Sequence, residues 1–322
     1  MHLLVPNYRF SLEREISGSA DYMEKNLLPK DKKVKMVFWS GDTTPSANAL
    51  KVAKEAGLYN INGSDTIITK SHNSWTLIRG LGVNKGDYFQ VFAPNQNEML
   101  YTNNWEGPYS GFNRVIETYE LTGHPRRFKP VNLYYHTYLV TKTAGLNSLK
   151  AIYRWIFAQD LFAIHASEYA QQVLAFNAVA LAKQDDTWSV ANPLGLKTLR
   201  LEHLPLPNLN TSLGLQGYAE EETGNYLHLS GHLSSWQQGK GQNQQPFLHK
   251  ANGQLIAFDA NQKNKEFSLK SHQNLQFSFA NMQHCHLLQQ GLRLKAEKIT
   301  NHIHFFRSKK RELRNLRLQC SK

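Results

Sequence analysis

Residues 34–61 read VKMVFWSGDTTPSANALKVAKEAGLYNI, and this stretch decides the fold class of the first half of the chain. Residues 34–39 form a short apolar run typical of a strand, and residues 58–61 form a second one. Between them, residues 45–56 have helical spacing and stop at Gly57, a common residue just beyond a helix. A strand, a helix and a strand in this order predict a parallel βαβ unit.

The same alternation continues to about residue 182 and predicts an α/β fold for the first half. Further strands are expected at residues 88–92, 131–135 and 161–164. Further helices are expected at residues 11–28, 109–121, 146–158 and 167–182. The predicted strands are fewer than the roughly eight of a closed (β/α) barrel, so we expect a barrel that lacks its N-terminal strands.

The second half has a different sequence pattern, in which short apolar runs are separated by Gly, Asn and Gln. This spacing is typical of an antiparallel β-sandwich or jelly roll. We therefore predict an incomplete α/β barrel over residues 1–185 and an all-β sandwich domain over residues 186–322. The chain has a net charge of +12, and residues 307–322 carry seven Lys or Arg and one acid, Glu312. This basic C-terminal tail is expected to be a solvated terminus.

Composition excludes several classes of protein. No nucleic-acid motif accompanies the basic surplus, so no nucleic-acid partner is expected; binding of a nucleic acid or an anionic surface through residues 307–322 is a third, weaker alternative. No apolar run approaches the roughly 20 residues of a membrane-spanning helix, and the N-terminus lacks the features of a signal peptide. Cys285 and Cys320 can form at most one disulfide.

Polar residues that directly follow apolar runs are the first candidates for a site, because loops at strand ends gather reactive groups in parallel α/β folds. Asp42, Asp65 and His136 stand at such positions. Each has a structural alternative: Asp often caps a turn, and a lone His in an aromatic segment is often a satisfied structural residue. Two carboxylates, one His and nearby Asn and aromatic side chains would form a polar pocket with stacking surfaces, which suits a sugar.

Two histidine pairs, His284 with His286 and His302 with His304, would each share one strand face. They suit a metal only if a third ligand converges on them. The sequence has no glycine-rich phosphate loop, no Gly-x-Ser-x-Gly elbow and no paired zinc cysteines, and its one His-x-x-x-His spacing, His228 with His232, lies in the second half of the chain. No metal ligands are therefore predicted within the chain.

Several ordered segments resemble the PelA-like polysaccharide deacetylases of Pel exopolysaccharide biosynthesis, over about residues 7–230. The segments that carry the resemblance are YRFSLEREI (8–16), FWSGD (38–42), INGSDT (61–66), APNQNE (93–98) and YYH (134–136). The resemblance implies a periplasmic or secreted bacterial enzyme that removes acetyl groups from N-acetylated hexosamines. It also implies a divalent metal, usually zinc, held by one Asp and two His.

By this resemblance His136 is the general acid that protonates the leaving amine, Asp65 orients it, and Asp42 is a substrate-contacting or supporting carboxylate. The substrate-binding residues implied around them are Trp39, Asn62, Asn95, Asn97, Trp105 and Tyr135. The partners implied are a polysaccharide substrate and the exopolysaccharide machinery.

The chain departs from the family in one respect. The Asp-Gly-Asp segment, which supplies the base and a metal ligand, does not occur in it, and its one His-x-x-x-His spacing, His228 with His232, falls outside the segments that carry the resemblance. We therefore expect a C-terminal part of a larger protein that turns over little by itself. The alternative is a non-catalytic carbohydrate-binding or matrix-associated protein, in which Trp39, Trp75, Trp105 or Trp236 could provide stacking faces.

Overall fold

The computed structural model describes residues 5–64, 66–104, 106–202, 204–222, 224–237, 243–258, 260 and 266–321. The chain divides into two compact units, Met1–Leu161 with His165–Val173, and Phe162–Ile164 with Leu174–Lys322. Helices and large antiparallel sheets are both present, and the described residues form no closed barrel. The division falls within α6 (Ala166–Ala178), earlier than residue 185, because β5 (Ala180–Gln184) already pairs with β6 (Thr187–Ala191).

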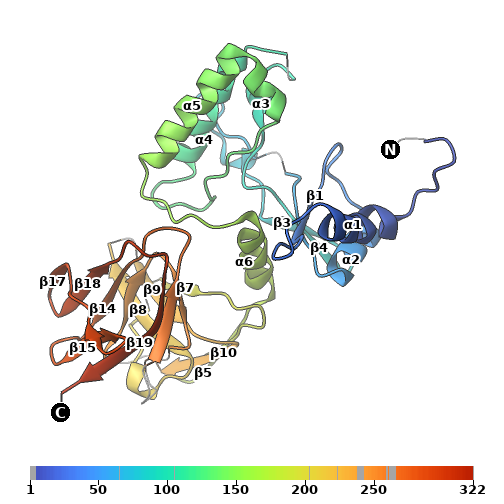
Figure 1. The fold of residues 1–322 in the computed structure, drawn as a ribbon. Helices are drawn as coiled ribbons and strands as arrows, with labels where there is room; N and C mark the ends of the chain where they lie inside the picture. Colours follow the sequence, from blue (N-terminus) through green and yellow to red (C-terminus); the bar gives the residue numbers. More distant parts are fainter. Residues whose placement is uncertain are drawn as a thin grey trace. The chain divides into compact units, whose positions relative to one another are not determined.

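The first unit begins with a small α/β layer (Figure 1). Its elements are η1 (Arg14–Gly18), α1 (Ser19–Asn26), β1 (Met36–Phe38), α2 (Ala47–Glu55), β2 (Tyr59–Ile61), β3 (Gly82–Lys85) and β4 (Tyr88–Val91). β1 and β2 pair in parallel on either side of α2 in the sequence, so the predicted βαβ unit is confirmed. β3 and β4 form an antiparallel hairpin.

Local sequence explains the limits of α2. The Ser46 hydroxyl accepts the backbone N–H of Ala49 at 3.2 Å and caps the N-terminus. At the other end Gly57 has a φ of +70°, and the N–H of Leu58 donates to the carbonyl of Ala53 at 2.9 Å. This is the Schellman pattern that a glycine allows, and it returns the chain to β2.

One side chain joins the two pairs of strands. The Asn60 amide donates to the carbonyl of Phe89 at 3.1 Å and accepts the N–H of Val91 at 3.2 Å. The N–H of Asn62 then donates to the carbonyl of Val91 at 3.1 Å. The end of β2 is therefore fixed beside β4, which places the loops after both strands close together.

The rest of the first unit is helical. It comprises η2 (Trp75–Leu77), α3 (Glu98–Tyr101), η3 (Tyr109–Arg114), α4 (Val115–Leu121), η4 (Thr137–Thr141), α5 (Thr143–Phe157) and α6. α4 and α5 lie side by side (Figure 1), with Phe112, Tyr119 and Ile152 buried in a common apolar cluster. The predicted helices at 109–121 and 146–158 are thus largely confirmed.

The strands expected at residues 131–135 and 161–164 are wrong. Residues 131–136 are extended, but their backbone partners are side chains rather than a neighbouring strand: the Tyr119 hydroxyl donates to the carbonyl of Asn132 at 2.8 Å. Residues 161–164 form the junction between the two units and also lie outside any strand. An apolar run forms a strand only where another strand is available to pair with it.

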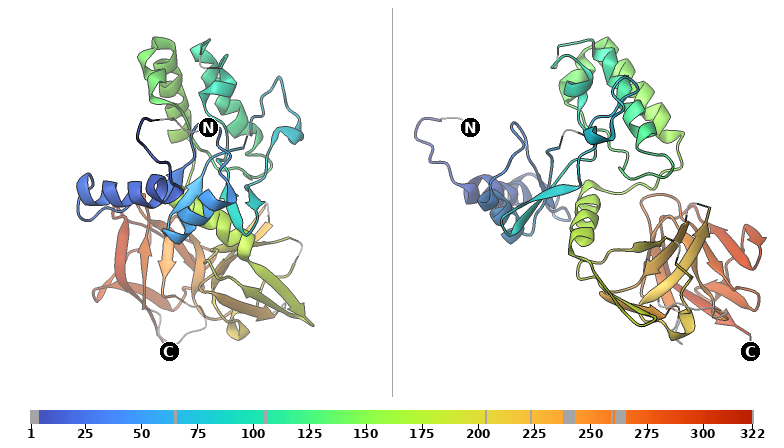
Figure 2. Two further views of the ribbon diagram at one scale, coloured as in Figure 1. Left: turned by 90° about the vertical axis from the view of Figure 1, so that its right-hand side faces the viewer. Right: turned by 180° about the vertical axis from the view of Figure 1, so that it is seen from behind.

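The second unit is rich in antiparallel sheet (Figure 2). Its strands after β6 are β7 (Thr198–Leu201), β8 (Leu215–Glu221), β9 (Gly224–Leu229), β10 (Leu233–Gln237), β11 (Phe247–Ala251), β12 (Gln254–Ile256), β13 (Glu266–Lys270), β14 (Gln276–Ala280), β15 (Cys285–Gln289), β16 (Leu292–Arg293), β17 (Lys298–Thr300), β18 (Ile303–Arg307) and β19 (Glu312–Cys320), with η5 (Leu209–Thr211) between β7 and β8. The larger sheets have the orders β17-β18-β14-β11-β8-β9-β7 and β12-β13-β19-β15-β16, and a smaller one has β10-β6-β5. Leu227 and Phe279 of one large sheet and Leu269 and Leu316 of the other belong to one core.

The expectation that the basic C-terminal segment is a solvated tail is wrong. Residues 312–320 form β19, which pairs with β13 and β15 inside the five-stranded sheet. Leu313 and Leu316 are buried in the core, whereas Arg314 and Arg317 are exposed. Arg314 and Arg317 thus lie on the outer side of the strand, and the pairing register with β13 shifts near Asn315, which has a φ of +53°, so that Leu313 and Leu316 both enter the core. β19 also carries Cys320, which forms a disulfide with Cys285 of β15.

Candidate functional site

The polar centre of the first unit begins in the loop after β4. Residues 93–97 are all buried, and the Asn97 side chain accepts the N–H of Met99 at 2.9 Å, which caps α3. Glu98 is the first residue of this short helix, and its side chain is only 1% exposed. A carboxylate with so little access to water requires partners within the protein.

His136 supplies those partners. Its backbone N–H lies 3.1 Å and 3.2 Å from the two carboxylate oxygens of Glu98, and its ring Nδ1 lies 2.8 Å from Oε1. The extended segment before η4 presents the histidine in this position, where its side chain is 40% exposed. Because the carboxylate accepts at Nδ1, it fixes the orientation of the ring and places Nδ1–H in the neutral tautomer.

Aromatic rings flank this histidine. The ring of Tyr138 stacks on that of His136, with centroids 5.4 Å apart and an interplanar angle of 17°. The Tyr134 ring lies 6.1 Å away on the same segment and contacts Phe38, the last residue of β1, edge to face at 5.1 Å. The pKa of Tyr138 is raised by loss of hydration and by the nearby Glu98 carboxylate. Tyr138 therefore keeps its proton at neutral pH and is able to donate a hydrogen bond.

The loop after β2 also contacts the segment that carries His136, through Tyr134. The buried Asn62 amide donates to the Tyr134 hydroxyl at 3.2 Å and to the carbonyl of Trp39 at 2.5 Å. Residues 62–64 all have positive φ, and a Cβ at Gly63 would lie 2.6 Å from Nε2 of Gln90. Glycine at this position allows the Gln90 side chain to donate to the backbone carbonyls of Thr43 and Asn62, both at 2.8 Å.

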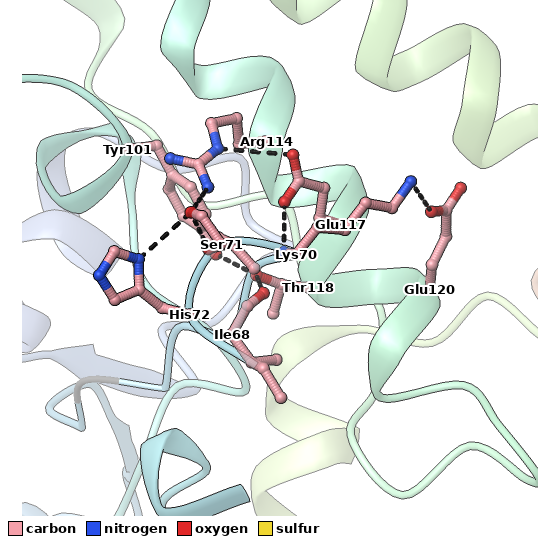
Figure 3. A network of polar contacts seen from close by, with 10 residues as sticks. Ile68, Lys70, Ser71, His72, Tyr101, Arg114, Glu117, Thr118 and Glu120 are labelled. Atoms are coloured by element: carbon pink, nitrogen blue, oxygen red, sulfur yellow. Dashed lines mark hydrogen bonds and ion pairs between the residues drawn. The ribbon is translucent and has the colours of Figure 1, made fainter. Parts of the chain in front are cut away.

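A polar network anchors the helix that carries Glu98 (Figure 3). Tyr101, one turn after Glu98 on α3, shares a 2.7 Å hydrogen bond with Thr118 of α4. The Thr118 hydroxyl donates to the carbonyl of Ile68 at 2.8 Å, and the Glu117 carboxylate accepts the N–H of Lys70 at 2.7 Å. Burial raises the pKa of the Tyr101 phenol, which stays protonated. α3 is thus tied to α4 and to the turn at residues 68–72.

Arg114 completes the network of Figure 3. Its guanidinium donates to the Ser71 hydroxyl at 2.5 Å and lies 3.4 Å from the Glu117 carboxylate. Ser71 also shares a hydrogen bond with the exposed His72 ring at 3.2 Å. These contacts lie at the surface and hold a turn in place.

The structure places the predicted substrate-binding residues in different roles. Asn62 lies beside Tyr134, as described, whereas Asn97 acts as the cap of α3. Asn95 is buried, and its Oδ1 atom has no hydrogen-bond partner among the described residues. The Trp39 indole donates to Asn60 at 3.2 Å and packs against the apolar cluster of α1 and α2. Tyr135 packs against the cluster around Phe112.

Asp42 serves a local role. Asp42 is exposed, and its carboxylate accepts the N–H of Thr44 at 2.6 Å and also the Thr44 hydroxyl. These hydrogen bonds lower the pKa of Asp42, and the geometry is that of a turn cap. Asp65 and Trp105, which the sequence also indicated, lie outside the described residues.

Glu98 is the member of the site that the sequence interpretation did not select. It stands at the end of the segment APNQNE, directly after a strand and a predicted loop, which was the signal used for the other candidates. Its partner lies 38 residues further along the chain. Only the tertiary fold shows that the two form a pair.

The histidine pairs of the second unit do not gain a third ligand. Among the described residues, no group of three or more His, Cys, Asp or Glu side chains could hold a metal ion. His286 and His304 instead line a cavity together with basic residues.

No protein-family model, no curated protein and no solved structure matches this chain. Within the part of the chain that the structure describes, no helix has the length and apolar character needed to cross a membrane. A function must therefore be inferred from the geometry of the Glu98–His136 pair and its surroundings.

Proposed function

We propose that this chain is part of a polysaccharide de-N-acetylase of exopolysaccharide biosynthesis that acts on N-acetylated hexosamines. The observation that carries the proposal is the hydrogen-bonded pair of buried Glu98 and partly exposed His136. Such a pair is suited to general acid–base catalysis, since the carboxylate orients the ring and the other ring nitrogen exchanges the proton. The resemblance in segments 61–66, 93–98 and 134–136 supports the same class of reaction.

In this proposal His136 protonates the nitrogen of the departing amine. Glu98 is a positioning residue, because it touches His136 and not the reacting atoms. The faces of Tyr134 and Tyr138 would stack on the sugar ring, and the Tyr138 hydroxyl, which hydrogen-bonds to the Glu98 carboxylate, would help to hold that carboxylate in place. Asp65 and Asp42 stay in the proposal as the orienting and supporting carboxylates that the resemblance implies.

Among the described residues, no group of three or more possible ligands is found for the divalent metal that the resemblance implies, and no step is assigned to that metal. The proposed role of His136 concerns a proton on the leaving nitrogen and is derived without the metal. The proposal further includes an incomplete deacetylase-type barrel followed by a β-sandwich, and a periplasmic or secreted location. The Cys285–Cys320 disulfide supports such a location, since disulfides persist in oxidising compartments.

The test measures acetate release from tetramers of N-acetylglucosamine and N-acetylgalactosamine by the full gene product, with Zn²⁺ added. His136→Ala is expected to lower the rate by about a hundredfold or more, the usual contribution of a general acid. His302→Asn is the matched control, because His302 is an exposed histidine in the turn between β17 and β18. Equal rates for His136→Ala and the unmodified protein would refute the role of His136.

A second candidate function is carbohydrate binding without catalysis. It is favoured by Trp75 and Phe128, whose rings stack 5.4 Å apart although both side chains are exposed. Exposed aromatic faces are typical of sugar-binding surfaces. Calorimetric binding of the same tetramers without acetate release, weakened by Trp75→Ala and unaffected by His136→Ala, would support this function. If the tetramers neither bind nor react, both candidates are wrong.

A further inference from the structure

The second unit contains a cavity of about 300 Å³ that the proposed function does not use. It lies where β15 and β16 of the five-stranded sheet approach β17 and β18 of the seven-stranded sheet. The segment between β16 and β17 crosses from one sheet to the other and supplies Leu294, Lys295 and Ala296 to its wall. The volume is at the lower end of the range for small-molecule sites.

The polar side chains of this cavity are all basic. They are His286 of β15, Arg293 of β16, Lys295 and His304 of β18, and no acidic side chain lines the cavity. Among the described residues, Arg293 and Lys295 have no ion-pair partner, although acids are nearby: Glu297 pairs instead with Arg307 at 3.4 Å. Positive charge is therefore concentrated here without an internal counter-charge, which favours an anion.

The surroundings of His286 and His304, the two histidines of the cavity, also favour an anion. Nδ1 of His286 is buried and has no hydrogen-bond partner among the described residues, a state that few polar atoms keep in a native structure. The pKa of His304 is lowered first by burial and then by the positive charges of Arg293 and His286. An anion in the cavity would relieve the repulsion on His304.

The rest of the wall is apolar. Leu294, Ile299 and Phe306 line the cavity, together with the disulfide-bonded Cys285. A free inorganic ion would leave this apolar surface against water, whereas a ligand with an apolar body would cover it. The cavity thus pairs a cationic edge with an apolar wall.

We propose that this cavity binds a small organic anion, with its phosphate, sulfate or carboxylate group between Arg293, Lys295 and the two imidazoles and its apolar body against Leu294 and Ile299. The inference concerns the second unit alone and does not depend on the proposed deacetylase activity. Arg293 is the principal anchor, because a guanidinium offers two parallel donors to a tetrahedral or planar oxyanion.

Isothermal titration of the intact chain with phenyl phosphate tests the proposal, with benzoate, inorganic phosphate and uncharged benzyl alcohol as further probes. We expect saturable binding of phenyl phosphate at millimolar concentrations or below, weaker binding of inorganic phosphate and none of benzyl alcohol. Binding of benzoate as tight as that of phenyl phosphate would assign the site to carboxylates, and weaker binding would assign it to phosphate or sulfate esters.

Arg293→Gln should raise the dissociation constant for phenyl phosphate by about tenfold or more, since a charge-assisted hydrogen bond is lost. Lys309→Gln removes the same charge from an exposed loop outside the cavity, and it should change the constant by no more than about twofold. A thermal unfolding scan of both variants checks that each is folded. Absence of saturable binding, or equal weakening by the two variants, would overturn the proposal.

Discussion

Replacing Glu98 by glutamine tests the central contact of the candidate site. The change keeps the shape of the side chain but removes the negative charge that accepts from the backbone N–H and the ring Nδ1 of His136. Glutamine can still accept one of these hydrogen bonds through its amide oxygen. Because hydrogen bonds to a charged group contribute about 1.5–3 kcal/mol each, we expect the free energy of unfolding to fall by about 2 kcal/mol.

Urea unfolding followed by tryptophan fluorescence measures this loss. Glu55→Gln is the matched control, because Glu55 is exposed and lies 3.8 Å from Lys51, a surface pair whose loss should cost at most about 0.5 kcal/mol. If Glu98→Gln is no more destabilising than Glu55→Gln, the buried carboxylate does not hold His136 as described.

A second readout separates orientation from stability. ¹⁵N NMR of the histidine rings should show the neutral ring of His136 protonated at Nδ1, as the carboxylate at 2.8 Å requires. In Glu98→Gln this tautomer preference should weaken, because an amide can present either a donor or an acceptor to Nδ1. A neutral His136 ring protonated at Nε2 in the unmodified protein would refute the proposed arrangement, whatever the stability of the variant.

Three further predictions concern stability. Cys285→Ser with Cys320→Ser should lower the free energy of unfolding of the second unit by about 4 kcal/mol, the closure entropy for a separation of 35 residues, as measured by urea unfolding. Burial lowers the pKa of His228 and His249, so the unfolded state takes up protons first as the pH falls below about 6.5. The melting temperature should therefore fall between pH 7.5 and roughly pH 5, and less so in His228→Gln; equal slopes for both proteins would contradict this. Burial also lowers the pKa of Lys129 to about 8, so the melting temperature of the unmodified protein should rise relative to that of Lys129→Met between pH 7 and roughly pH 9, as the lysine becomes neutral in the folded state; parallel pH profiles of the two proteins would contradict this.

The sequence predicted those elements whose pattern is local. α2 has its cap at Ser46 and its stop at Gly57 within one short stretch, and the structure contains both. Short apolar runs of the second half are found as β6, β9 and β14. In these cases the residues that specify an element are also the residues that form it.

The errors concern segments whose partners lie far away in the sequence. Residues 131–135 have strand-like composition, but their backbone is bound by Tyr119 and the adjoining His136 by Glu98. The C-terminal segment has the charge of a solvated tail, but Leu313 and Leu316 place it in the centre of a sheet. The local charge and apolar content of a segment do not show which other part of the chain will pack against it.

The difference between local patterns and partners that lie far away in the sequence also explains which residues of the candidate site were predicted. His136 was predicted because it follows an aromatic run, whereas Glu98 was not selected although it ends the segment APNQNE. Glu98 is the first residue of α3, with Asn97 as the cap. The position in the helix accounts for its backbone, whereas the burial of its carboxylate is compensated by the hydrogen bonds from His136 and Tyr138. A carboxylate that is completely buried at the start of a four-residue helix therefore contributes more to the placement of its histidine than to the helix, and this is why Glu98→Gln is the variant that best separates a site from a structural contact.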